Sequence, residues 1–286
     1  MFSVQQKALE VMLLTISSDV DESAPSPWPF LSSVCKLVKS LVFSLKLLMP
    51  TDEVTSQYSA FGGSTASPTN AHACDLVLRR LAVRLLIKCL YRLADALLKS
   101  SGLTEDETQY VRGTVQDVAC HFNGIAGEVF EQYFGLMQEQ DDALVESMSI
   151  LFNLHFRTEF LASSEGCSEL VQMFGVHRVF IGFLSTVSWS HEVLLDFLSS
   201  SETEFLGYIL RYLRHVNSDV EGFMEAIAVN TSSTHALPNM CTRNNMQKCL
   251  SDLTASVDRL SRKGLLPFRA DVLISRLQRV VHLLIT

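Results

Sequence analysis

Apolar residues recur at the spacing of an α-helix along almost the whole chain, and this pattern constrains the fold more than any other feature. Residues at i, i+3, i+4 and i+7 share one face of a helix, whereas a half-buried strand alternates apolar and polar residues. Such alternation is nearly absent here. The sequence therefore predicts an all-α protein of antiparallel helical pairs, as an armadillo/HEAT-like solenoid or an irregular helical array.

Breaks in the helical pattern divide the chain into five segments. Proline lacks a backbone donor and clashes with the preceding turn, so Pro50 ends a helix, and stretches rich in Ser, Thr, Asn and Gly predict loops. The predicted segments are residues 1–50 (N-terminal helices), 51–70 (flexible linker), 71–217 (helical core), 218–240 (second linker) and 241–286 (C-terminal helical pair).

Several helix starts carry recognisable signals. Thr104 with Glu107 and Ser201 with Glu204 each match the S/T-x-x-E capping box, in which two side chains bond reciprocally to backbone N–H groups. Ser190 is a predicted N-cap residue, and Pro267 suits the first turn of the last helix. We therefore expect helices to begin at each of these positions.

The composition indicates extensive burial without a membrane span. Hydrophobic residues make up 48% of the chain and charged residues 19%, with a mean hydropathy of +0.21. A bilayer span needs roughly 20 consecutive apolar residues. Lysines or arginines interrupt the longest apolar stretches, in residues 31–49 and after Ala73, so both are predicted to be buried helices.

The first residues and the cysteines predict an intracellular location. Lys7 and Glu10 interrupt the N-terminal apolar pattern and no small-residue cleavage site follows, which disfavours a secretory signal. The seven cysteines are odd in number and scattered through apolar helical pattern, which is typical of reduced core thiols. We expect the cytoplasm, the nucleus or both.

No catalytic, cofactor or metal site follows from the sequence. Zinc sites usually show closely paired Cys or His ligands, serine hydrolases a G-x-S-x-G turn, and phosphate-binding loops a G-x4-G-K-S/T frame. None of these patterns occurs. The chain is accordingly predicted to be non-enzymatic, with no cofactor, no metal and no small-molecule substrate indicated.

Four cations repeat every fourth residue in the predicted helix of residues 71–99, which places them along one slowly drifting face. We call them the basic stripe: Arg80, Arg84, Lys88 and Arg92. One interpretation is a docking surface for an acidic peptide or a phosphate backbone. The alternative is a solvated face partly paired with acidic neighbours, which would contribute little to binding.

Two segments resemble the Lines family. Residues 188–215, SWSHEVLLDFLSSSETEFLGYILRYLRH, are similar to its most distinctive stretch, with VLLDFL followed by SxET and a second apolar helix. Residues 248–280, KCLSDLTASVDRLSRKGLLPFRADVLISRLQRV, resemble its C-terminal conserved region. Family members are usually much longer, so we expect a truncated, alternatively spliced or partial form.

The resemblance implies an armadillo-like helical protein without known enzymatic activity, associated with developmental patterning and Wnt- or Hedgehog-type signalling in the nucleus or cytoplasm. It carries over no catalytic residue. Protein partners are therefore expected, and a regulator or scaffold of signalling or transcription is the favoured function.

Two other functions stay open. A nucleic-acid-associated protein would contact phosphates through the basic stripe and a C-terminal basic group, although the net charge of −8 disfavours this. The C-terminal basic group comprises Arg259, Arg262, Lys263, Arg269, Arg276 and Arg279. An enzyme would need a site assembled from distant residues, for which His121, His155 and Glu159 are the least implausible ingredients.

Overall fold

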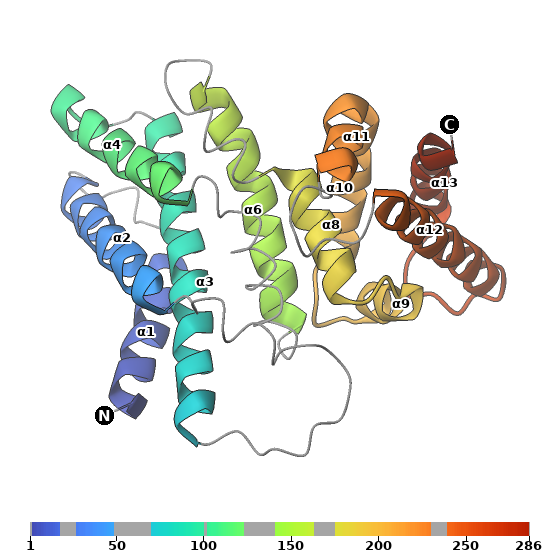
Figure 1. Ribbon diagram of the computed structural model, residues 1–286, viewed down its shortest axis with the longest axis horizontal. Coiled ribbons are helices and arrows are strands. Elements are labelled where there is room, and N and C mark those ends of the chain that lie inside the picture. The colour runs from blue at the N-terminus through green and yellow to red at the C-terminus, as the bar shows by residue number, and fades with distance from the viewer. Residues whose placement is uncertain are drawn as a thin grey trace. The chain divides into compact units, whose positions relative to one another are not determined.

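In a computed structural model, all regular secondary structure in the described part of the chain is α-helical (Figure 1). The structure describes residues 2–17, 27–48, 70–99, 102–122, 141–162, 175–229 and 239–285. These residues contain no strand, which confirms the all-α prediction. The chain divides into two compact units, residues 1–123 with 156–171 and residues 124–155 with 172–286, so the predicted core of residues 71–217 draws on both. A solenoid arrangement stays a prediction.

Unit 1 is organised around its longest helix. The helices are α1 (Phe2–Ser17), α2 (Trp28–Leu48), α3 (Asn70–Lys99) and α4 (Glu105–Phe122), together with the last turns of α6 (Asp141–Ala162). Helices α1, α2 and α4 all pack against α3. Leu86, Leu90, Leu93 and Leu97 of α3 are buried at helical spacing, so this helix presents the apolar face that the sequence predicted.

Unit 2 packs a cluster of aromatic rings between short helices. Its elements are the start of α6, α8 (Val176–Thr186), α9 (His191–Ser199), α10 (Phe205–Ser218), α11 (Val220–Val229), α12 (Asn239–Arg262) and α13 (Asp271–Ile285). Phe180, Tyr208 and Tyr212 are fully buried, and the rings of Phe180 and Tyr212 lie 4.0 Å apart. Large rings contribute much of the buried apolar area here.

The second predicted linker is wrong over residues 220–229, which form α11. The Asn- and Ser-rich composition that suggested a linker belongs to residues 230–238, which lie outside the described residues. Within α11, Phe223 and Ile227 repeat at i+4 and are buried, so a short amphipathic pattern was overlooked. The first predicted linker also lies outside the described residues, except for Asn70, which begins α3.

One predicted capping box forms and the other does not. The Thr104 N–H donates to the Glu107 carboxylate at 2.8 Å, and the Glu107 N–H donates to the Thr104 hydroxyl at 3.3 Å. In unit 2, α10 begins after Glu204 with no side-chain cap, so the Ser201–Glu204 box is wrong. The Thr203 hydroxyl instead donates to the carbonyl of Phe197, which closes the α9–α10 turn.

Of the two other predicted helix starts, one is confirmed and one is wrong. The Ser190 hydroxyl accepts from the Val193 N–H, which confirms Ser190 as the N-cap of α9. Pro267 does not start a helix, because α13 begins at Asp271. The intervening turn follows Gly264, whose φ of 66° lets the N–H of Leu265 reach back to the carbonyl of Leu260.

Candidate functional site

The basic stripe lies on α3 and is half-buried rather than fully solvated. Arg92 donates from Nε to the carbonyl of Ile16 at 2.8 Å, near the end of α1. The last carbonyls of a helix lack intrahelical partners and carry the negative end of its dipole, so a guanidinium is favourable there. Arg80, Arg84 and Lys88 also make interactions within the chain. Arg92 thus ties α1 to α3, and docking at the stripe stays a prediction.

A second charged cluster of unit 1 lies where α6 meets α3. Arg157 pairs with Asp95 and also donates to the hydroxyl of Tyr91 at 2.8 Å. Its guanidinium lies 4.5 Å from the centre of the Tyr91 ring, and Lys99 pairs with Asp95 from the other side. Every charge in this cluster meets an acceptor or an opposite charge, which is what partial burial of an ion pair requires.

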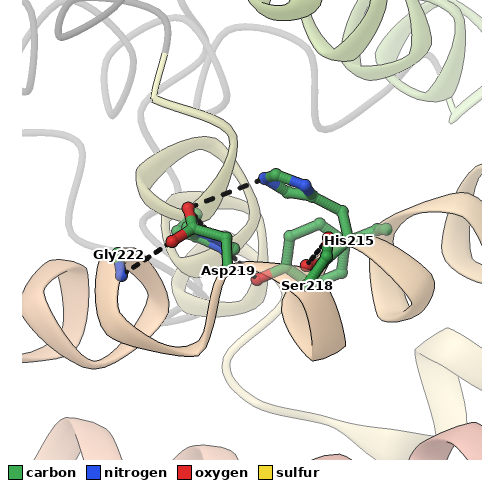
Figure 2. Close-up of polar contacts among 6 residues, drawn as sticks. His215, Ser218, Asp219 and Gly222 are labelled. Atoms are coloured by element: carbon green, nitrogen blue, oxygen red, sulfur yellow. Dashed lines mark hydrogen bonds and ion pairs between the residues drawn. The ribbon is translucent and has the colours of Figure 1, made fainter.

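A third polar cluster, which was not among the predicted sites, occupies unit 2. It consists of His177 near the start of α8, His215 near the end of α10 and Asp219 at the junction of α10 and α11. Figure 2 labels His215 and Asp219. The side chains of His177 and His215 are 6% and 11% exposed, whereas that of Asp219 is 43% exposed. The cluster therefore reaches solvent on the side of the carboxylate.

The Asp219 carboxylate connects the members of this cluster. Oδ2 lies 3.2 Å from Nε2 of His177 and 3.9 Å from Nε2 of His215. Oδ1 accepts from the N–H of Gly222 at 3.0 Å, so Asp219 also caps the first turn of α11. Figure 2 shows the carboxylate between Gly222 and the ring of His215. One side chain thus serves both a helix start and two imidazoles.

Aromatic rings hold the imidazoles in place. His177 stacks on His215 with ring centres 5.1 Å apart and an angle of 8° between the planes. The hydroxyl of Tyr212 lies 3.3 Å from Nδ1 of His177, and Phe223 meets the edge of the same ring. His155 and Phe152 of α6 approach the ring of His215. Each imidazole is consequently confined by packing as well as by polar contacts.

This environment shifts the pKa values of His177, Asp219 and Tyr212. Burial, reinforced by the neighbouring His215, lowers the pKa of His177 to about 4, although Asp219 opposes the shift. Partial burial opposes ionisation of Asp219, but the Gly222 N–H and His177 hold its pKa below the usual value. Burial raises the pKa of Tyr212 well above its ordinary range. At neutral pH the cluster thus contains a neutral His177 and an ionised Asp219.

The chemistry available to this cluster is that of donor atoms rather than of a nucleophile. The hydroxyl of Ser218 donates to the carbonyl of its neighbour His215 at 2.8 Å (Figure 2), so it is committed to the backbone. A nucleophilic triad needs an accessible hydroxyl or thiol bonded to the imidazole that would deprotonate it. The hydroxyl that contacts His177 belongs to Tyr212, which is fully buried and has a raised pKa. Two imidazoles and a carboxylate are instead a familiar ligand set for a metal ion.

Sequence reasoning missed this cluster because its members are far apart in the chain. His215 and Asp219 are spaced i, i+4, which was the only local signal, and His177 is remote from both. Of the residues named as ingredients of an assembled enzyme site, His155 does lie next to His215. The side chains of His121 and Glu159 lie outside the described residues.

The C-terminal basic group is partly engaged within the protein. Arg276 donates to the carbonyl of Leu210 at 2.6 Å, and Arg262 pairs with Asp258 one turn earlier at 2.7 Å. A phosphate backbone would have to compete with both contacts, so these two side chains do not form a ready surface for nucleic acid.

Comparison with known proteins identifies one family. The family model of the Lines N-terminus matches residues 19–227, which include the segment 188–215. "Protein lines" of Drosophila melanogaster is 33% identical over 107 residues, covering 37% of this chain and 11% of that protein.

Two mammalian relatives match similarly. "Protein Lines homolog 1" of Homo sapiens is 32% identical over 95 residues, covering 30% of this chain and 12% of that protein. The Mus musculus protein of the same name is 35% identical over 103 residues, covering 30% and 13%. The matches thus span about an eighth of the length of these relatives or less. No solved structure gives a significant match.

The helices can also be compared with the length and hydropathy of a membrane-spanning helix. Within the described ranges, none combines the length and the hydropathy that crossing a bilayer requires.

Proposed function

The chain belongs to the Lines family, and from this premise we propose that it acts as a non-enzymatic interaction protein, a regulator or scaffold in developmental signalling of the Wnt or Hedgehog type or in transcription. The observation that carries the proposal is the family match over residues 19–227. The relatives are named as Lines proteins, and no catalytic family is indicated. The cytoplasm or nucleus is the proposed site of action.

The structure contributes two supporting observations. Three polar side chains that could have served chemistry make contacts within the fold: Arg92 and Arg276 donate to helix carbonyls, and Ser218 donates to the carbonyl of His215. Long packed helices nevertheless leave extended surfaces, which is how helical repeat proteins recruit partners. We place the partner surface at the basic stripe, and the test below spares Arg92 because its contact with the end of α1 is known.

The test is affinity capture from cells with wild type and with Arg80, Arg84 and Lys88 each changed to Glu. Arg92 is retained so that α1 stays tied to α3. We expect the triple variant to lose a subset of protein partners. Because the three side chains are half-buried and make interactions within the chain, circular dichroism and thermal melting must first show that the variant is folded. Identical partner sets would show that the stripe is not the docking surface.

A matched charge reversal at Arg259, Lys263 and Arg279 tests the nucleic-acid alternative. Repeating the wild-type capture after nuclease treatment separates direct protein contacts from those tethered by nucleic acid. If the partners depend on these C-terminal cations and disappear with nuclease, the chain is a nucleic-acid-associated protein and the scaffold proposal fails. Partners that survive nuclease in this variant support the scaffold.

A further inference from the structure

We propose that His177, His215 and Asp219 form a binding site for a transition-metal dication, with Zn²⁺ the best fit, which fastens α8 to the junction of α10 and α11. One ligand atom from each residue lies within 4.8 Å of the other two. The proposal concerns the internal architecture of unit 2 and is independent of which partners the chain binds.

The spacing of the ligand atoms is close to what a metal needs. Zinc bonds of about 2.0–2.1 Å in a tetrahedral site place neighbouring ligand atoms roughly 3.3 Å apart. Nε2 of His177 is already 3.2 Å from Oδ2 of Asp219, and Nε2 of His215 is 3.9 Å from the same oxygen. Since the largest separation is at most 4.8 Å, closure needs a shift of about 1.5 Å or less, within the reach of side-chain rotation.

One of the two imidazole rings must rotate before both can bind the ion. The two imidazole planes are nearly parallel, so their Nε2 lone pairs cannot both point at one ion until one ring turns. Tyr212 and Phe223 hold the ring of His177. Both nitrogens of His177 also make polar contacts. We therefore expect the ring of His215 to turn, against the packing of Phe152 and His155, and metal binding to break its stacking on His177.

The surrounding groups are arranged as metal sites require. A ligating histidine commonly bonds its second nitrogen to another group, which orients the ring, and Tyr212 occupies that position at Nδ1 of His177. The Gly222 N–H holds Oδ1 of Asp219 and leaves Oδ2 for the ion. A Cβ atom at position 222 would lie 2.4 Å from Oδ2 and 2.8 Å from Oδ1, so only glycine lets the carboxylate sit here.

The donor set selects the type of ion. Calcium and magnesium prefer all-oxygen ligands, whereas imidazole with a carboxylate suits zinc and its first-row neighbours. Three protein ligands leave a fourth position for water. The exposed face of Asp219 provides the route by which ion and water enter.

The experiment strips the chain with a chelator, adds ZnCl₂ and measures affinity by competition with a chromophoric chelator. We expect one tightly bound Zn²⁺ per chain, and X-ray absorption of the zinc-loaded chain should show only nitrogen and oxygen ligands, at about 2.0–2.1 Å. The chain also has seven cysteines. A sulfur shell near 2.3 Å would therefore assign the ion to thiols and overturn the proposal.

Three variants locate the ion. His215→Gln and Asp219→Asn should each weaken Zn²⁺ binding at least tenfold, and the asparagine can still accept from Gly222. Gly222→Ala changes no ligand but displaces the carboxylate, so it should weaken binding several-fold although alanine favours a helix. His191→Gln, the same substitution at the start of α9, should leave affinity unchanged.

Circular dichroism and thermal melting in chelator establish that each variant is folded. The absorption spectrum of the wild type tests the ligand set even where a variant fails to fold. Wild-type affinity in all three variants would overturn the site, as would a wild-type chain that binds no Zn²⁺.

Discussion

The polar clusters of the two units are built on different ionisable groups, although in unit 2 the guanidinium of Arg276 also meets a helix carbonyl. In unit 1 the groups are guanidinium ions: Arg92 meets a carbonyl at the end of α1, and Arg157 meets Asp95 and Tyr91. In unit 2 the groups are imidazoles, and His177 and His215 stack among aromatic rings. Arginine keeps its charge in proteins, so it requires an acceptor at every site, whereas histidine can be buried neutral.

This difference predicts which unit responds to pH and to zinc. A permanently charged group with a fixed partner contributes the same contact at any pH near neutrality. A neutral buried imidazole loses stability on protonation and offers a lone pair to a metal. Unit 1 is therefore expected to be insensitive to pH and zinc, and unit 2 sensitive to both.

The largest expected effect comes from the aromatic packing that confines the imidazoles. Phe180→Ala removes a fully buried ring that lies against Tyr212, and such truncations cost about 3–5 kcal/mol. Urea unfolding gives the loss, and hydrogen exchange should place it in α8 and α10. The exposed Val193→Ala on α9 is the control, expected within about 0.5 kcal/mol. Equal loss of protection in α3 would mean that the two units unfold together, which would contradict the expectation that they respond separately.

A pH titration tests the neutral imidazole directly. The pKa of His177 is about 4 in the folded chain and 6.5 unfolded, so between these values the unfolded state binds more protons. Stability should fall as pH drops from 6.5 to 4, by about 3 kcal/mol at most. Urea titrations in chelator measure this, and His177→Gln should flatten the slope over that window. An equally steep slope in the variant would assign the acid sensitivity to other groups.

The ion pair of unit 1 should give a smaller effect. Asp95→Asn removes the charge that Arg157 and Lys99 share, but the amide oxygen can still accept, so we expect a loss of about 1–2 kcal/mol. Urea unfolding of the variant and the wild type at pH 7 measures the difference. Asp106→Asn in the exposed first turn of α4 is the control and should cost less.

The smallest effect is expected from the S/T-x-x-E capping motif, which occurs at Thr104 in unit 1 and at Ser201 in unit 2. Thr104→Ala breaks a capping box that forms, and should cost about 1 kcal/mol. Ser201→Ala alters one that does not form, and should change stability by less than about 0.5 kcal/mol. Thermal unfolding of both variants distinguishes the cases. A cost at Ser201 equal to that at Thr104 would mean that the cap forms in solution after all.

Helices were predictable where apolar residues repeat regularly at helical spacing, and their ends were less predictable. The predicted helix of residues 71–99 agrees with α3 to one residue, and buried leucines repeat at helical spacing from Leu81 to Leu97. The same S/T-x-x-E pattern succeeded at Thr104 and failed at Ser201, where the Thr203 hydroxyl bonds to Phe197 and sets a different turn. A short motif names the groups that can bond but does not choose between competing partners.

The sequence by itself determined that this chain is helical, since i, i+3 and i+4 spacing is a local property written in consecutive residues. It also determined the family, because two segments resemble the Lines family. The family match over residues 19–227 includes the first of them, residues 188–215. Only the tertiary structure brought His177 to His215 and Asp219. Their meeting depends on how α8 packs beside α10 and α11, and no spacing along the chain encodes a contact between residues so far apart.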